Sequence, residues 1–167
     1  MPKRIALLRH AKSTNSDPSL ADHDRPLSKR GERDAPVMAR RLVEGGGRPS
    51  MILTSTARRT RQTVRIIARE IGYPIEFIQG EPDLYLASAR NILDVIARQD
   101  ESFSEIIVCA HNPGITQLAN ALCGTSIDNV PTCGMVLMEV EIENWSGLDG
   151  ARCTLLNFDY PKKKASA

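Results

Sequence analysis

Aromatic residues are scarce in this sequence, since phenylalanine, tryptophan and tyrosine make up 4% of its 167 residues. Charge of one sign is scarce too, because 22 lysine and arginine residues stand against 20 aspartate and glutamate residues and leave a net charge of +2. So small a surplus does not indicate a nucleic-acid-binding protein. Hydrophobic residues at 41% and charged residues at 25% are ordinary globular values, so the composition indicates neither a disordered nor a fibrous chain.

Other absences concern metals, membranes and nucleotides. The four cysteines form no Cys-x-x-Cys pair and have no zinc-like spacing to histidine, so we expect buried free thiols and no metal; they are Cys109, Cys123, Cys133 and Cys153. No apolar run approaches the roughly 20 residues of a membrane helix, and no signal-peptide core follows the first basic residues. A phosphate-binding G-x-x-x-x-G-K-[ST] loop is also missing. We expect a cytoplasmic protein with no membrane partner and no cofactor.

What is present is an alternation of short apolar runs and helical periodicity. The length suits one domain, which we place at residues 1–160, with residues 161–167 as a disordered tail. We predict strands at 5–8, 51–54, 75–78 and 105–110, and helices at 28–44, 56–72, 88–98 and 113–124. Pro36 should kink or restart the first helix. Two late runs, 134–143 and 151–160, read as a β-hairpin or a pair of strands. The pattern predicts an α/β, three-layer sandwich with a mostly parallel central sheet.

Basic and imidazole side chains follow three of these strands. Arg9, His10 and Lys12 come after the first strand, the arginine-rich segment 55–63 after the second, and His111 after the fourth. Ligands of open parallel sheets bind at the carboxyl ends of the strands, where the helix N-termini add positive charge. An Arg-His pair or a single histidine means little alone, so the joint placement is what indicates a site. The site favours an anion, most simply a phosphoryl group.

The helix at 56–72 separates one arginine from the others. Arg58, Arg61, Arg65 and Arg69 follow helical spacing and form one stripe, which is the usual solvent-facing arrangement. At about 100° per residue, Arg59 lies about 110° from the centre of that stripe and within the first turn. Arg59 is therefore the arginine we expect to face a ligand.

The third histidine, His23, lies between two aspartates in the polar segment 13–26. A solvated loop histidine is the default interpretation there. A metal site formed with the flanking aspartates is the alternative.

The segments LLRHAKS, TSTARRTRQT and VCAHNPG, in this order and on these elements, resemble the signature segments of the histidine phosphatase superfamily, which includes the phosphoglycerate mutases. The likeness extends through DHDRPLSKRG and LYLAS, and the compact length resembles the short bacterial phosphohistidine phosphatase branch of the SixA type. The resemblance implies a phosphoglycerate mutase-like fold. It also implies that Arg9, His10, Arg59 and His111 form the catalytic site.

Two positions depart from the family pattern. Ala11 stands where the family often has glycine, a small change that should preserve close packing. The mutases also supply a glutamate proton donor near the exit of the third strand, where this chain reads QGEPDLYLAS. Glu81 and Asp83 are the nearby carboxylates, and neither matches that motif cleanly, so the general acid is unassigned.

The implied reaction is metal-independent phosphate hydrolysis through a phosphohistidine intermediate on His10, because a neutral imidazole is a nucleophile that needs no deprotonation. The expected partner is a histidine-phosphorylated protein or a small phosphorylated molecule, and no nucleic acid. A phosphatase of small esters or a mutase of the same family is one alternative. A noncatalytic phosphate-recognition module is another, although a binder gains little from a nucleophilic histidine.

Overall fold

The sheet is built around β1 (Lys3–Arg9), whose four central apolar residues are fully buried. The structure is a computed structural model that describes residues 2–163. β1 pairs in parallel with β4 (Glu105–Ala110), and β4 pairs in parallel with β2 (Met51–Thr54). Two of these three strands occupy the predicted residues, and β1 extends slightly beyond them. A continuous apolar run suits such strands because both of their faces are covered.

The remaining strands complete a six-stranded sheet in the order β3-β2-β4-β1-β5-β6. β5 (Met135–Val140) pairs antiparallel with both β1 and β6 (Thr154–Asp159), which confirms the predicted pair of late strands. The short β3 (Gln79–Gly80) pairs in parallel with β2. The sheet is therefore mostly parallel, with β5 as the strand that runs against the others.

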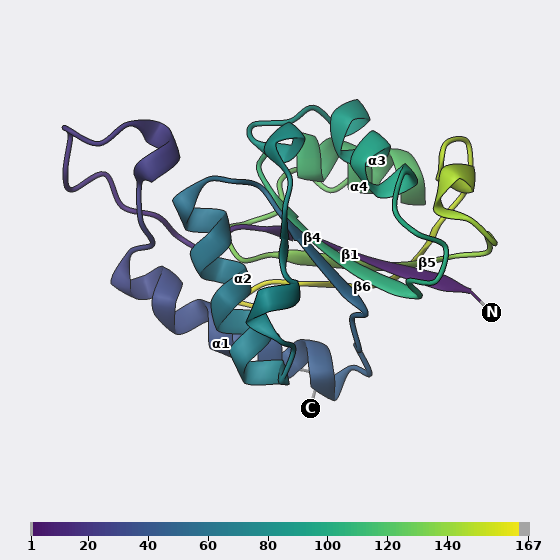
Figure 1. Cartoon of the computed structure of the whole chain (residues 1–167), viewed down its shortest axis with the longest axis horizontal. Coiled ribbons are helices and arrows are strands. Elements are labelled where there is room, and N and C mark those ends of the chain that lie inside the picture. The colour runs from purple at the N-terminus through teal and green to yellow at the C-terminus, as the bar shows by residue number, and fades with distance from the viewer. Residues whose placement is uncertain (1, 164–167) are drawn as a thin grey trace.

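Four helices cover the two faces of this sheet (Figure 1). α1 (Lys29–Glu44) and α2 (Arg58–Ile71) lie on one face, and α3 (Ala89–Ala97) and α4 (Gly114–Cys123) lie on the other. This arrangement confirms the α/β, three-layer sandwich. Ser28 caps α1 by accepting a hydrogen bond from the amide of Gly31, as its position before the helix predicts.

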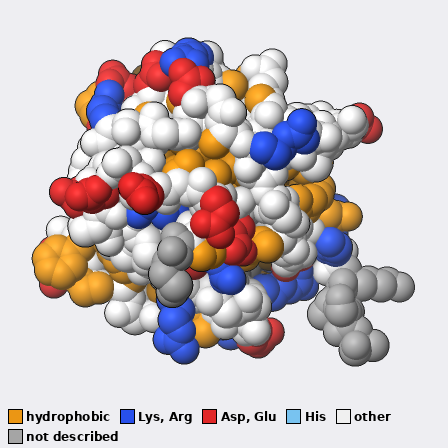
Figure 2. Space-filling view, turned by 90° about the vertical axis from the view of Figure 1, so that its right-hand side faces the viewer, with side chains coloured by type: hydrophobic (Ala, Val, Ile, Leu, Met, Phe, Trp, Pro, Cys, Tyr) orange, Lys and Arg blue, Asp and Glu red, His pale blue; other side chains and the backbone are white. Residues whose placement is uncertain are grey.

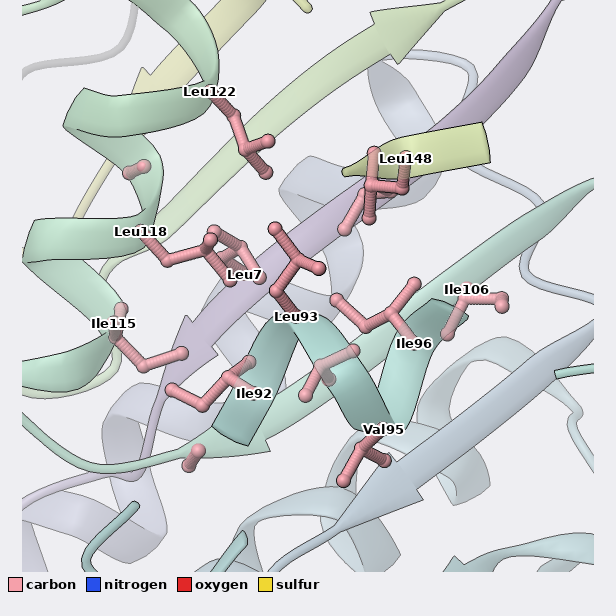
Figure 3. Close-up of a cluster of buried hydrophobic side chains, with 14 of the residues drawn as sticks. Leu7, Ile92, Leu93, Val95, Ile96, Ile106, Ile115, Leu118, Leu122 and Leu148 are labelled. Atoms are coloured by element: carbon pink, nitrogen blue, oxygen red, sulfur yellow. The ribbon is translucent and has the colours of Figure 1, made fainter. Parts of the chain in front are cut away.

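Alternate residues of β1 enter two separate hydrophobic clusters, because successive side chains of a strand point to opposite faces. Ile5 and Leu7 pack with α3 and α4, in the cluster that Figure 3 shows. Ala6 and Leu8 pack with α1 and α2. The two cores hold the carboxyl ends of the central strands at one edge of the sheet.

The strand predicted at 75–78 is wrong. Residues Ile75–Phe77 form a 3₁₀ turn, and strand pairing begins only at Gln79. Residues three apart lie on the same side of a 3₁₀ helix, so Ile75 and Ile78 both pack against the α1–α2 core while Phe77 is 64% exposed. Apolar residues at this spacing satisfy a helical turn as well as a strand.

Pro36 does not restart the first helix, which runs from Lys29 to Glu44 without interruption. Proline removes the hydrogen bond to the carbonyl of the residue four positions earlier, here Glu32. Glu32 is exposed, so water reaches that part of the helix and the loss is tolerated. The prediction of a restart is therefore wrong.

The surface and the cysteines agree with the composition. On the side of the molecule shown in Figure 2, acidic, basic and apolar side chains are interspersed, as the small net charge predicts. All four cysteines are free thiols; Cys109, Cys133 and Cys153 are buried, and Cys123 is partly buried. None of the helices within residues 2–163 combines the length and apolar character needed to cross a bilayer. Residues 164–167 of the predicted tail lie outside the described part of the chain.

Candidate active site

The register of the sheet brings the two strand-end histidines together. Arg9 at the end of β1 pairs with Ala110 at the end of β4, so His10 and His111 leave neighbouring strands at the same level. Their ring centroids lie 5.5 Å apart. Both side chains are buried, His10 at 8% exposure and His111 at 2%. The two histidines predicted from the sequence therefore share one site.

One hydrogen bond orients the His10 ring. Its Nδ1 lies 2.8 Å from the carbonyl oxygen of Ala11, and a carbonyl can only accept, so Nδ1 carries the proton. Nε2 is then left with a free lone pair. Burial lowers the pKa of His10 to about 4, with smaller contributions from Arg59, Arg9 and Arg25, while the bond to Ala11 opposes the shift. The imidazole is therefore neutral at pH 7, the form that can act as a nucleophile.

Arg59 enters the site from the first turn of α2, as its helical phase predicts. Its residue exposure is 3%, whereas Arg58, Arg61, Arg65 and Arg69 are all exposed. Nη2 lies 3.4 Å from Nδ1 of His111, and Nε is buried without a hydrogen-bond partner. The N-terminal turn of α2 carries no acidic residue, so its partial positive charge is not neutralised there.

Arg9 presents a second guanidinium group. Its Nη1 donates to the carbonyl of Val130 at 3.1 Å, which anchors the side chain, and its Nε is buried with no partner. Burial, and then the charge of Arg59, lowers the pKa of Arg9. Buried N–H groups without acceptors are unusual in folded proteins. Two of them on neighbouring guanidinium groups fit a bound oxyanion.

His111 is fixed through both ring nitrogens. A guanidinium can only donate, so Nδ1 of His111 accepts from Arg59, and Nε2 carries the proton and donates to Oγ of Ser55 at 2.8 Å. Ser55 Oγ also accepts from the amide of Ala57. Burial, together with the charges of His10 and Arg59, lowers the pKa of His111 to about 3. Ser55 is thus a site residue whose individual role the sequence pattern did not indicate.

The structure gives roles to two side chains, Asp22 and Tyr85, that lie in family-like segments but had no assigned role in the proposed phosphoryl site. Asp22 accepts hydrogen bonds from Arg59 through both its backbone carbonyl, at 2.8 Å, and its carboxylate, at 3.1 Å. Tyr85 packs edge-on against His111 with ring centroids 5.6 Å apart. Asp22 begins a short 3₁₀ turn and Tyr85 directly follows another, and such short turns give no periodic signal in the sequence.

His23 is not simply a solvated loop histidine. Its Nε2 lies 2.9 Å from Oγ1 of Thr56, and its ring packs edge-on against Tyr85. The side chain is 39% exposed, so it lies at the rim of the site. Within residues 2–163, no three His, Cys, Asp or Glu side chains form a group that could hold a metal ion.

The two carboxylates considered as general acids point elsewhere. Glu81 and Asp83 both form ion pairs with Arg98, with N–O distances of 3.0 and 3.1 Å. Lys12 is exposed, and its backbone carbonyl accepts hydrogen bonds from Ser28. Ala11, where the family often has glycine, is fully buried and donates its amide to Thr63. The side chains of Glu81, Asp83 and Lys12 form no hydrogen bond or ion pair with His10 or His111.

The site places a neutral histidine beside two guanidinium groups, an arrangement that suits a phosphoryl group. Comparison with known proteins agrees. The profile of the histidine phosphatase superfamily (branch 1) matches residues 5–84. An uncharacterized chloroplastic protein from Arabidopsis thaliana is 35% identical over 151 residues, which cover 86% of this chain and 69% of that protein. The chain therefore belongs to the histidine phosphatase superfamily.

Solved structures place the chain with the compact SixA-type members. The structure of SixA from Agrobacterium tumefaciens matches with a TM-score of 0.82 and 28% identity, over 96% of this chain and 99% of that one. A mycobacterial glucosyl-3-phosphoglycerate phosphatase shares the fold, with a TM-score of 0.67 and 16% identity over 93% of this chain and 98% of that one.

Proposed function

We propose that this phosphatase hydrolyses protein-borne phosphohistidine, and that it does so through a phosphohistidine intermediate on His10. The orientation of His10 supports the nucleophilic role. Nδ1 is held by the Ala11 carbonyl, so Nε2 is the nitrogen that attacks phosphorus. As the Nε2–P bond forms, the bond from phosphorus to the substrate nitrogen breaks. Water then attacks the phosphorylated His10, which releases inorganic phosphate and regenerates the neutral imidazole.

The surrounding cations stabilise the transferring group in this proposal. The free Nε–H groups of Arg9 and Arg59 donate to phosphoryl oxygens, and positioning with electrostatic stabilisation supplies most of the catalysis in phosphoryl transfer. A bound dianion raises the pKa of His111, because a nearby opposite charge favours the protonated imidazole. A protonated His111 then adds a positive charge beside the phosphoryl group, and the proton on Nδ1 ends the hydrogen bond from Arg59.

The observation that carries the substrate class is the state of the nearby carboxylates. Within residues 2–163, Asp22 is the one acidic side chain that forms a hydrogen bond or ion pair with Arg9, His10, Arg59 or His111. Hydrogen bonds from Tyr85, Arg25 and Arg59 hold the pKa of Asp22 well below its usual range, so it has no proton to give. An alkoxide leaving group gains about 10²–10⁴-fold from a general acid. A phosphohistidine whose second ring nitrogen already carries a proton releases a neutral imidazole, so it depends less on a general acid.

The form of the site supports a protein-borne substrate. Residues 81–88, which connect β3 to α3, hold only a 3₁₀ turn at Pro82–Leu84. So short a segment does not build the large lid that encloses a small metabolite. A phosphorylated side chain on a protein surface can therefore approach His10.

The direct test compares kcat/KM for a histidine-phosphorylated protein, a phosphoserine peptide and 3-phosphoglycerate. We expect the phosphohistidine protein to be preferred, and a clear preference for either ester would overturn the substrate class. A brief incubation with labelled substrate should place the label on His10, and His10→Ala should remove both the label and the activity. Label on another residue would overturn the nucleophile. Binding of all three substrates without turnover would instead support the noncatalytic module.

A further inference from the structure

One loop residue binds the outer end of the catalytic arginine. The carbonyl oxygen of Asp22 accepts from Nη1 of Arg59 at 2.8 Å, and Oδ2 of the same residue accepts from Nη2 at 3.1 Å. Arg59 is 3% exposed, so this pairing lies at a buried group. The Nε–H of Arg59 remains without an acceptor. Asp22 therefore occupies the Nη end of the guanidinium group and leaves Nε free.

Asp22 is itself held on both carboxylate oxygens. The hydroxyl of Tyr85 donates to Oδ2 at 2.5 Å, and Nε and Nη2 of Arg25 donate to Oδ1 at 3.2 and 3.0 Å. These charge-assisted bonds are stronger than bonds between neutral groups. They also lower the pKa of Asp22, so the group stays an anion through the working range of pH. Asp22 is a fixed acceptor, not a proton donor.

The loop that carries Asp22 is fastened at its base. The amide of Ser28 donates to the carbonyl of Lys12 at 2.8 Å, and the amide of Thr14 donates to the carbonyl of Pro26 at 3.0 Å. The amide of Leu27 donates to Oε1 of Gln62, one turn along α2 from Arg59. In Figure 1 the loop, residues 13–26, projects beyond the carboxyl ends of the central strands. The base of the loop is therefore attached to α2, the same helix that carries Arg59.

We propose that Asp22 is a positioning residue that orients Arg59 for phosphoryl transfer, with Tyr85 holding Asp22 in place. This inference rests on the proposed role of Arg59 as a phosphoryl ligand. The Asp22 carboxylate also repels an incoming anion, because it is a negative charge bound directly to Arg59, the proposed phosphoryl ligand. Asp22 therefore weakens simple anion attraction while it fixes the direction of the Nε–H group. The repulsion lowers the affinity for an anion, whereas the orientation of Arg59 raises the affinity for the transition state. The two effects can therefore be measured separately.

The separation uses two oxyanions, vanadate as a mimic of the five-coordinate transition state and inorganic phosphate as a mimic of the ground state. In Asp22→Ala, Arg59 loses its carboxylate partner, so we expect vanadate affinity and kcat to fall about tenfold or more. Phosphate affinity should stay the same or rise, because a repulsive charge is removed. Asp22→Asn keeps an amide oxygen for Arg59 and should give an intermediate kcat. Binding is measured by calorimetry, and turnover is measured with p-nitrophenyl phosphate.

Asp17→Asn is the matched control, because it removes the same charge from an exposed residue of the same loop whose hydrogen bonds go to Ser19. It should leave both affinities and kcat unchanged. If Asp22→Ala does not fold, Tyr85→Phe removes one bond to Asp22 and should shift vanadate affinity in the same direction by a smaller factor. Unchanged vanadate affinity in the Asp22 or Tyr85 variants, or equal effects on vanadate and phosphate, would overturn the proposal. An Asp22-dependent vanadate site in a protein that ignores phosphohistidine would overturn only the proposed substrate.

Discussion

Five arginines lie on α2, and Arg59 alone among them turns into the protein. The difference follows from the helical phase, because residues one position apart point about 100° from each other. A buried guanidinium group needs hydrogen-bond acceptors. Asp22 supplies two acceptor atoms and His111 supplies a third. At the scale of the residue, the direction of the side chain from the helix decides whether an arginine lies in the site or faces the solvent.

The first prediction compares Arg59 with an arginine on the exposed stripe. Arg59→Ala should lower kcat/KM by on the order of 10²-fold or more, because it removes a donor to the transition state. Arg65→Ala removes the same charge from the exposed face of the same helix and should change kcat/KM little. Steady-state kinetics on a single phosphorylated substrate provide the measurement. Equal losses in the two variants would show that long-range charge, and not contact, explains the effect.

The second prediction concerns the protonation of His10. Burial and neighbouring cations lower its pKa from the usual 6.5 to about 4, so the reactive neutral form persists as pH falls through 6 and 5. His10 should therefore remain a neutral nucleophile down to about pH 4, and the rate of phosphoenzyme formation should fall below that pH as the ring is protonated. Proton NMR of the His10 ring gives the titration without interference from ionisation of the substrate. A midpoint near 6.5 would show that the ring is not desolvated as described.

At the scale of the element, the loop 13–26 and α1 meet through a close backbone contact. Gly31, in the first turn of α1, is fully packed against Lys12: a Cβ there would lie 2.2 Å from the Lys12 carbonyl oxygen. That same carbonyl accepts the bond from Ser28 that closes the base of the loop. Glycine is needed at position 31 because the helix and the loop base approach too closely for a side chain.

The third prediction follows from this contact. Gly31→Ala should lower the free energy of unfolding by roughly 1–3 kcal/mol, the usual cost of overpacking, although alanine is the better helix former by about 1 kcal/mol. Gly80→Ala is the control, since a Cβ at that position meets nothing within 4 Å. Urea unfolding monitored by circular dichroism measures both variants. Similar stability in the two would mean that the base of the loop can move away from α1 at little cost.

At the scale of the whole molecule, the fold places positive charge at one edge of a nearly neutral protein. The net charge is +2, yet Arg9 at the end of β1 and Arg59 in the first turn of α2 bring two guanidinium groups with buried Nε atoms to one site. The first turn of α2 adds its partial charge to the same edge. This concentration of charge, rather than the total, prepares the protein for a phosphorylated ligand.

The fourth prediction is that activity survives EDTA and is inhibited by vanadate. The guanidinium groups supply the positive charge that a metal ion provides in other phosphatases. Phosphate release is measured before and after chelation, with vanadate added in a parallel titration. Loss of activity on chelation, restored by a divalent ion, would instead place His23 and its flanking aspartates in the reaction.

Much of the candidate site could be predicted from the sequence because its signals are local. Apolar runs marked β1, β2 and β4, and the residue after each strand end had to lie at one edge of a parallel sheet. Helical phase separated Arg59 from its neighbours. The same locality explains the error at 75–78, where Ile75 and Ile78 suit a 3₁₀ turn as well as a strand.

The sequence by itself determined the four α-helices, the strands other than β3, and the strand ends that carry His10, His111 and the arginines, because spacing of two and 3.6 residues is a property of the local chain. Only the tertiary structure decided that Asp22 holds Arg59, 37 positions away, and that Tyr85, 63 positions from Asp22, holds the carboxylate. Those contacts depend on the path of an aperiodic loop. The path is set by hydrogen bonds at the base of the loop and by packing against α1 and α2, which no local pattern encodes.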